Sequence, residues 1–478
     1  MFNVLKDIET KYPVSEILVN GRQAWPYLRI HYYSQYARQV ARLLGEREAY
    51  DLSPFSNKLR ALKTSLRGLP RWFRRYDYIA LSSASYRRPV NGRHCDRFLD
   101  PIIDELGGRN ALLIETPTPI HFPAEHTHTT NVVSSIPLNL VAWLLGKPLR
   151  SRVRIGNFAL LKAIQRDYGL QVDDRAIAAR FAAQYIVFKF VFRMMRPKVL
   201  LLTCYYGGRE AAVRAAKDVG VTVVEVQHGV IGKEHPAYNL RTDIDRSCFP
   251  DDLLIFGDSE RDTFKNGRFL DPANIHPVGS FYIEYMKSTF KSNPAMVARL
   301  AGYRRTVGVT LQLAAEKRLA DFIRQAALLD ATIGYVLIPR VADDYLSSMT
   351  FPDNVIIISN HNFYELMMYV DFHATLYSTC ALEAPSLGVQ NILIDTDNMA
   401  RTYYGGVLTD RMVTRYVNTP AEFVETAHFF ERMDRRTVCS LNAAIFAVNY
   451  KDNVKDYVTK HLRPPVPSAN AREYVASP

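Results

Sequence analysis

Residues 376–395, which read LYSTCALEAPSLGVQNILID, contain side chains suited to an anionic ligand. A buried strand ends at Ser378, and Ser378 and Thr379 then begin a helix that carries Glu383 in its first turns. The free N–H groups at such a helix start favour a phosphate, and Glu383 could accept hydrogen bonds from ribose hydroxyls. Alternatively, Ser378 or Thr379 only caps the helix, although the spacing to Glu383 does not complete a capping box.

A second strand end, VVEVQHGVIGKEHPAY, carries two histidines. His228 follows the strand directly, where it could act as a general base or bind a phosphate or carboxylate. Glu234 and His235 offer a second acid–base pair, and Gly229 allows a sharp turn or a close approach to a ligand. A single histidine is usually structural, but two beside Gly229 and Lys233 favour function. A metal site here lacks a third ligand at a useful spacing.

Two further strand ends supply candidate binding residues. In VGS, Gly279 and Ser280 could direct backbone donors at a phosphate near a domain junction, or form a plain turn. Arg340 follows another strand and could grip a phosphate through two hydrogen bonds. It could equally pair with Asp343 or Asp344.

Two long polar loops follow the first two strands of the chain. Residues 82–97 carry four arginines, and residues 115–130 carry three histidines with the candidate catalytic carboxylates Glu115 and Glu125. Substrate residues often collect on such loops. From these loops we expect the acceptor to be bound by Arg87, Arg88 and His126. A metal cluster of His121, His126 and His128 has no recognised scaffold, so a solvated loop is the alternative for these histidines.

The elements that position these residues are short runs of Val, Leu and Ile, typical of strands covered on both faces. Helical patterns separate them, which predicts βαβ units and parallel sheets. The strands are expected at 78–83, 111–116, 199–206, 221–227, 253–257, 306–313, 333–340, 354–360, 372–378 and 391–395.

Two such series, joined near residue 285, predict an α/β fold with two Rossmann-like domains facing each other across a cleft. We expect an acceptor-side domain with a helical N-terminal extension over residues 1–280. A nucleotide-sugar-binding domain would cover residues 281–464, and a disordered tail residues 465–478.

Length and composition restrict the function classes. With 478 residues and 54.5 kDa, the chain exceeds what one core usually organises. The formal net charge of +12 and pI near 9.3 indicate a polyanionic partner: nucleic acid, an anionic membrane or a phosphorylated substrate. Five scattered cysteines without a CxxC pair disfavour a zinc ribbon and fit a reducing compartment. No signal peptide or spanning segment is evident, so we expect a cytoplasmic protein.

The segment Lys58–Arg75 holds seven Lys or Arg residues and no acid. Leucines and aromatic residues interleave with these bases at helical spacing up to Pro70. This pattern suits an amphipathic segment lying on an anionic inner-membrane surface, and equally an ordinary basic helix packed on the domain. Nucleic acid is not expected as a partner, because no RNA-binding aromatic signature or zinc finger accompanies the bases.

Several motifs in chain order resemble one enzyme family. The QHG strand end at 227–229, the stretch LLIFGDSERDTF followed by IHPVGS, and VDFHATLYSTCALEAPSLGVQNILID resemble glycosyltransferases of the GT-B fold. They are most similar to bacterial surface-polysaccharide transferases of the capsule, Kdo and sialic-acid groups. Sugar-nucleotide 2-epimerases of similar fold share the last motif. The resemblance covers residues 199–395, and the first 190 residues resemble no family that we can name.

The resemblance implies a nucleotide held by the C-terminal domain and His228 close to the transferred sugar. The donor-binding residues that it implies are Gly279, Ser280, Arg340, Ser378, Thr379 and Glu383. A helix start and an arginine can stabilise the leaving group without a metal, and no DxD-like metal motif stands at a strand end. The candidates for deprotonating the acceptor are His228, Glu125 and His235.

We therefore expect a metal-independent glycosyltransferase of the hexosyl or Kdo/sialyl type. It would move a sugar from a CMP- or UDP-linked donor, with no other cofactor, to a glycan or lipid-linked acceptor of capsule or lipopolysaccharide synthesis. Domain closure would exclude water and limit hydrolysis of the donor. The alternatives are a sugar-nucleotide 2-epimerase or hydrolase of the same fold and a basic nucleic-acid-binding protein.

Overall fold

The fold is seen in a computed structural model. It describes residues 4–43, 65, 68–108, 110–118, 121–232, 235–312, 315–339, 346, 348–359 and 362–462. Half of the basic segment Lys58–Arg75, Arg340 with Asp343 and Asp344, and the predicted tail 465–478 lie outside the described residues.

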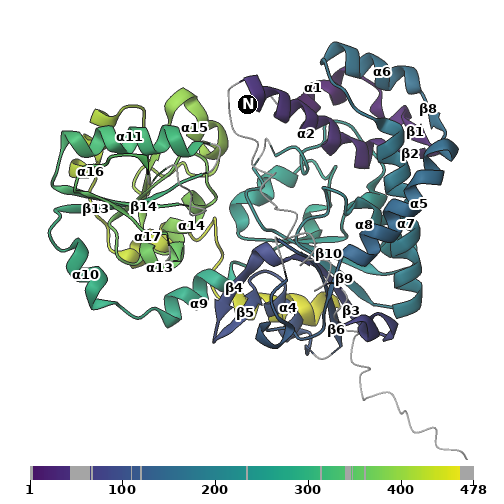
Figure 1. The fold of residues 1–478 in the computed structure, drawn as a ribbon, viewed down its shortest axis with the longest axis horizontal. Coiled ribbons are helices and arrows are strands. Elements are labelled where there is room, and N and C mark those ends of the chain that lie inside the picture. Colours follow the sequence, from purple (N-terminus) through teal and green to yellow (C-terminus); the bar gives the residue numbers. More distant parts are fainter. Residues whose placement is uncertain are drawn as a thin grey trace, which may run out of the picture.

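The first lobe is built on a seven-stranded parallel sheet (Figure 1). Its spatial order is β12-β11-β10-β9-β3-β6-β7. Numbered along the chain, the strands therefore run 7-6-5-4-1-2-3, the order of a doubly wound Rossmann sheet. Their bounds are β3 (Tyr78–Ser83), β6 (Ala111–Thr116), β7 (Val132–Ser134), β9 (Val199–Leu202), β10 (Thr222–Val226), β11 (Asp252–Ile255) and β12 (Ile275–Pro277).

The second lobe is built on a six-stranded parallel sheet with the order β15-β14-β13-β16-β17-β18. Along the chain this is 3-2-1-4-5-6, again a Rossmann order, which reverses direction between β13 and β16. Its strands are β13 (Arg305–Thr310), β14 (Ile333–Ile338), β15 (Val355–Ile357), β16 (Phe372–Ala374), β17 (Gln390–Ile394) and β18 (Thr414–Val417).

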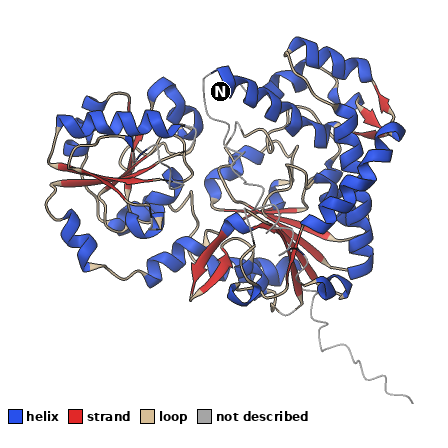
Figure 2. Cartoon of the chain, in the orientation of Figure 1, coloured by secondary structure: helices blue, strands red, loops and turns tan. Residues whose placement is uncertain are grey.

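Helices cover both faces of each sheet (Figure 2). Side chains alternate between the faces, as in β9, where Leu200 and Leu202 pack under the N-terminal helices while Leu201 packs on the opposite side. The helices of the first lobe are α1 (Val4–Lys11), α2 (Trp25–Leu43), α4 (Asp100–Glu105), α5 (Ile136–Arg152), α6 (Phe158–Asp167), α7 (Asp174–Met195) and α8 (Glu210–Lys217).

The remaining helices follow β12. They are α9 (Phe281–Thr289), α10 (Pro294–Leu300), α11 (Glu316–Leu329), α13 (Phe363–Met367), α14 (Cys380–Ser386), α15 (Met399–Tyr404), α16 (Pro420–Phe429), α17 (Arg435–Leu441) and α18 (Tyr450–Tyr457). Two small antiparallel sheets join β1 (Leu18–Val19), β2 (Arg22–Gln23) and β8 (Ile155–Gly156), and pair β4 (Arg87–Val90) with β5 (Arg93–Asp96).

The C-terminal helix α18 returns to the first lobe. It packs against α4 and α9, and Tyr457 donates a hydrogen bond to Asp252 in β11 at 2.9 Å. One apolar core runs from the first sheet through α18 and α9 to α13 and α14 of the second lobe, so the two lobes are packed together. The domain limits set at residues 280 and 464 stay predictions.

The predicted α/β class with two Rossmann-like parallel sheets is confirmed by the strand pairing. The strands expected at 78–83 and 111–116 agree with β3 and β6 residue for residue. The loop expected over residues 82–97 instead contains the β4–β5 hairpin. None of the described helices combines the length and apolar character needed to cross a bilayer.

Candidate functional site

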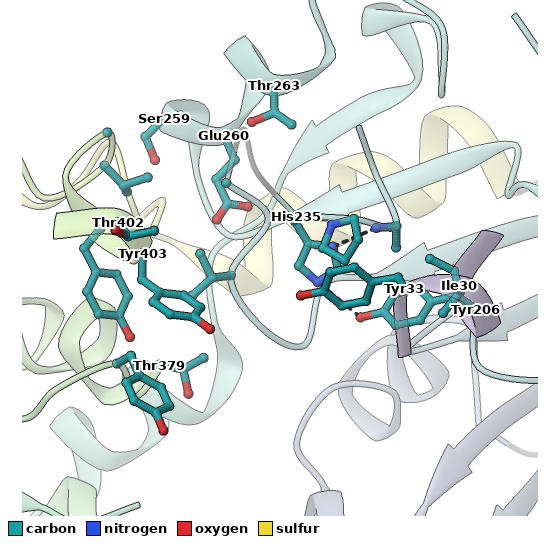
Figure 3. Close-up of a pocket in the computed structure, with 18 of the residues that line it drawn as sticks. Ile30, Tyr33, Tyr206, His235, Ser259, Glu260, Thr263, Thr379, Thr402 and Tyr403 are labelled. Carbon is teal, nitrogen blue, oxygen red and sulfur yellow. Dashed lines mark hydrogen bonds between the residues drawn. The ribbon is translucent and has the colours of Figure 1, made fainter. Parts of the chain in front are cut away.

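A pocket of about 510 Å³ lies between the two lobes (Figure 3). Its first-lobe walls come from α2 and from the loops that follow β9, β10 and β11. Its second-lobe walls come from the segment after β16 and from α15. Both sheets thus present the carboxyl ends of their strands to one cavity, the usual ligand position in such sheets.

On the first-lobe side, His235 lines the pocket beside Tyr206. The Ala237 N–H donates to His235 Nδ1 at 3.2 Å, so Nε2 carries the proton and lies 3.5 Å from the Tyr206 hydroxyl. Burial lowers the pKa of His235 to about 3, so the ring is neutral at pH 7. With its nitrogens used in this way, neutral His235 can donate a hydrogen bond to a ligand through Nε2–H but has no free lone pair to act as a base.

Glu260, in the turn after β11, lines the same pocket. The Ile231 N–H donates to its Oε1 at 3.2 Å, and the Gln227 amide donates to Oε2. Burial raises the pKa of Glu260 to about 7. A carboxyl held in place with a pKa near neutrality has the properties of a general base or acid.

His228 does not line this pocket, but its ring lies beside that of Tyr206, with the two ring centroids 6.3 Å apart. Its Nδ1 is buried without a hydrogen-bond partner, and the ring also bonds the Thr203 backbone. Burial, followed by the charge of Arg209, lowers the pKa of His228 to about 4. In the neutral ring, Nδ1 therefore remains a free hydrogen-bond acceptor, to which an N–H or O–H group of a ligand could donate.

The second-lobe wall combines hydroxyls with aromatic rings. Thr379 lines the pocket, and a Cβ at Gly229 would approach its Cγ2 to 4.0 Å, so the two strand ends nearly touch. The rings of Tyr377 and Tyr403 stack with centroids 5.3 Å apart. Parallel rings and hydroxyls of this kind suit a base or a sugar ring.

Ser378 accepts hydrogen bonds from backbone N–H groups of the turn that it begins. Its Oγ accepts from the Cys380 N–H at 3.3 Å, and its carbonyl accepts from the Ala381 N–H at 2.9 Å. The Leu382 N–H is bonded to the Thr379 carbonyl. These first-turn amides are therefore occupied by the turn itself, and the capping alternative describes Ser378 better than a direct phosphate contact.

Glu383 contacts the other lobe instead of the pocket. Its Oε1 accepts from Arg97 at 3.3 Å and from the Tyr364 hydroxyl at 2.6 Å. Arg88 packs in the same region and donates to the backbone carbonyls of Ser85 and Arg87. In this arrangement the carboxylate is not available to a ribose.

Gly279 and Ser280 lie away from the 510 Å³ pocket and border a separate small cavity with Arg97. Gly279 has φ of +88°, and a Cβ there would overlap the carbonyl of Ala447. The VGS turn thus packs against the C-terminal segment and does not line this pocket, and its assignment to the donor site stays a prediction. Arg340 lies outside the described residues.

The polar loops of the first lobe are also separate from the pocket. Arg87 is buried in ion pairs with Glu115 and Asp100, which corrects its assignment to acceptor binding and removes Glu115 from the catalytic candidates. Glu125 and His126 form an exposed turn after β6, three strands from β10, and neither lines the pocket.

The three histidines of the second loop do not converge on a metal site. His121 bonds Glu115 and Ser134, whereas His128 bonds Asp104. Within the described part of the chain, one group has metal-ligand geometry, made by Asp252, His276 and His461 at the β11–β12 edge outside the pocket.

Of the residues that line the pocket, the sequence indicated Thr379 and His235 but missed Glu260, Tyr206 and Tyr403. Glu260 stands five residues after Ile255, the last residue of β11, in a stretch rich in acids, DSERD. Its position after a strand was the available signal, and only the packing of β10 against this turn reveals its burial. Among the described lining residues there is no Lys or Arg.

No protein-family model and no curated protein matches the chain. Solved structures do match it. A putative UDP-N-acetylglucosamine 2-epimerase from Listeria monocytogenes has 10% identity and a TM-score of 0.49 over 80% of this chain and 95% of its own. CalG4, the calicheamicin glycosyltransferase, has 13% identity and a TM-score of 0.49, and the match covers 81% of this chain and 100% of that one. The glycotransferase of kitacinnamycin has 14% identity and a TM-score of 0.49, and the match covers 82% of this chain and 100% of that one.

Similarity at this level carries no argument about activity. The strand order of the two sheets and the pocket between them are the observations that establish the fold. They are the arrangement that the resemblance to GT-B glycosyltransferases implied, with two Rossmann-like lobes facing one cleft.

Proposed function

We propose that the chain is a glycosyltransferase that transfers a sugar from a CMP- or UDP-linked donor to a glycan or lipid-linked acceptor of bacterial surface polysaccharide. The observation that carries this proposal is the pocket formed by strand ends of both sheets. A volume of about 510 Å³ fits a nucleoside joined to a sugar. The motifs in chain order from QHG to EAPSLG support the same class.

The donor's nucleoside would lie on the second lobe. The stacked rings of Tyr377 and Tyr403 offer a flat apolar surface to a base, and the Thr379 hydroxyl can bond a ribose or phosphate oxygen. The phosphates would point to the first lobe, toward Arg209, which lies outside the described lining of the pocket and whose charge acts on His228. A fixed positive charge there stabilises the leaving group as its bond to the sugar breaks.

The acceptor hydroxyl must lose a proton during transfer, and Glu260 is the candidate base. Its carboxyl lines the pocket and has a pKa raised by burial to about 7, so about half of these groups can accept the proton at pH 7 and most of them above it. His228 is the second candidate because its Nδ1 is unpaired. Neutral His235 would hold its Nε2 proton toward the substrate or Tyr206.

A product assay tests the proposal. The chain is incubated with each labelled sugar nucleotide, with and without membranes of a capsule-producing bacterium as the acceptor source. Label that appears in glycan or lipid only when chain and membranes are both present supports transfer. Conversion of the donor to an epimer or free sugar without any acceptor would replace the proposal by the 2-epimerase or hydrolase alternative.

A further inference from the structure

Helix α5 exposes large apolar side chains on the surface of the first lobe. Those side chains are between 37% and 58% exposed and belong to Leu140, Val141, Trp143, Leu144 and Leu145. Within this run only Ala142 is buried, where it packs with Ala183 and Val187 of α7. A helix on a water-exposed surface usually carries polar residues at such positions.

The contact between α5 and α7 uses small residues. A Cβ at Gly146 would lie 3.8 Å from the Cβ of Ala183. Because the helices meet through glycine and alanine, the larger side chains of α5 are left pointing outward. The neighbouring α7 adds exposed Ile186 and Phe190 to this surface, which we name the α5–α7 face.

A third element extends this face. The short helix η2 (Leu69–Phe73) contacts α7 and β7, the strand that leads into α5. Its Phe73 is 81% exposed and is followed by the exposed residues Arg74 and Arg75. This is the described end of the basic segment that the sequence associated with a membrane.

The two helices of this face carry more basic than acidic residues. Helix α5 contains three bases and no acid, and α7 contains four bases and one acid, the buried Asp174. The Lys147 ammonium lies 3.7 Å from the centre of the Trp143 ring, so a cation and an aromatic ring share one spot on the surface. Two of the bases have acidic contacts, Arg150 with Asp173 and Lys189 with Asp218.

We propose that the α5–α7 face binds the surface of an anionic phospholipid bilayer. Trp143, Leu144 and Phe190 would enter the headgroup region, while Lys147 and its neighbours bind lipid phosphates. The attraction of each base to such a surface adds to the binding that apolar burial provides. This inference is independent of the proposed glycosyl transfer, because it concerns lipid and not substrate.

Charge favours a membrane over a second copy of the chain. In a two-fold dimer the face would meet itself, so bases of α5 and α7 would oppose bases. Like charges opposed in an interface are unfavourable, whereas anionic headgroups neutralise them.

The fluorescence of Trp143 can report binding of this face to a bilayer. The chain contains three tryptophans, of which Trp25 and Trp72 are buried and Trp143 is exposed. Vesicles of phosphatidylglycerol mixed with phosphatidylcholine should shift the emission to shorter wavelength and co-sediment with the chain, and added salt should weaken both effects. Trp143→Phe should abolish the emission shift while co-sedimentation persists. Vesicles of phosphatidylcholine alone should give much weaker binding.

A matched pair of variants locates the surface. Leu144→Glu should reduce co-sedimentation at least tenfold, whereas Leu328→Glu should leave it unchanged, because Leu328 is an exposed leucine on α11 of the other lobe. The proposal is overturned if the intact chain ignores anionic vesicles, or if both variants bind as the intact chain does. It is also overturned if sedimentation shows a dimer that Leu144→Glu dissociates.

Discussion

Arg97 of the first lobe donates to the Glu383 carboxylate of the second lobe, with 3.3 Å between Nη1 and Oε1. The Tyr364 hydroxyl donates to the same oxygen at 2.6 Å. The Arg97 Nε is buried without a partner, so the charge has one acid and one unused donor. The pair therefore links the two lobes outside the 510 Å³ pocket.

The first prediction concerns this pair. Glu383→Gln should lower the melting temperature because it leaves the Arg97 charge buried without its counter-ion. The double variant with Arg97→Gln should recover part of the loss. A double-mutant cycle by thermal denaturation should give a coupling of about 0.5–3 kcal/mol. Strict additivity of the two substitutions would show that the pair does not link the lobes.

The second prediction concerns Glu260. Glu260→Gln should reduce transfer about 100-fold or more, because the amide cannot accept the acceptor's proton. The base must be ionised, so activity of the intact chain should fall as the pH drops through about 7, the value to which burial raises the pKa of Glu260. The residual activity of the variant should lack this dependence.

The control for Glu260 is His228→Asn, measured over the same pH range. If His228 is the base, the intact enzyme should stay active down to about pH 4, the lowered pKa of that ring, and Glu260→Gln should retain most of its activity. That result would move the catalytic assignment from Glu260 to His228.

The third prediction separates packing from ligand binding at Gly279. Gly279→Ala should lower the melting temperature by several degrees, because its φ is +88° and its new Cβ would overlap the Ala447 carbonyl. The nucleotide affinity of the folded fraction should stay close to that of the intact chain. Normal stability with a selective loss of nucleotide binding would restore the VGS turn to the donor site.

The fourth prediction is a pH dependence of stability. Glu225 is fully buried, Tyr238 donates to its Oε1, and burial raises its pKa to about 8. Between the ordinary carboxyl value and pH 8 the native state binds more protons than the unfolded state, so this group lowers stability as pH rises. Glu225→Gln should therefore gain melting temperature over the intact chain from pH 5 to pH 8. Exposed Glu425→Gln is the control and should show no such trend; parallel curves for all three proteins would contradict the prediction.

The core strands could be read from the sequence because burial on both faces demands uninterrupted apolar residues, as in Tyr78–Ser83 and Ala111–Thr116. The β4–β5 hairpin was missed because its strands are rich in arginine. Asn91 and Gly92, both with positive φ, are the two-residue turn that could have revealed it.

The site could be predicted only in part. Residues in the segments that follow a strand, such as Thr379 after β16 and His235 after β10, agree with the rule that ligands bind beyond strand ends, and both line the pocket. Glu383 and Arg87 satisfied the same rule, yet both form ion pairs with residues far away in the sequence. Glu383 pairs with Arg97, and Arg87 pairs with Glu115. Glu260 depends on Gln227 and Ile231 for its setting, and such pairings arise only in the folded chain.

Binding of nucleotides to the interlobe pocket is the central claim, and thermal denaturation with UDP, CMP, GDP and CDP measures it most directly. A ligand at one hundred times its Kd adds about 2.7 kcal/mol to the stability of a native state that alone binds it. At least one nucleotide should raise the melting temperature of the intact chain and of Leu328→Ala, and raise that of Tyr403→Ala clearly less. The claim is contradicted if no nucleotide stabilises the chain, or if Tyr403→Ala responds as fully as the control.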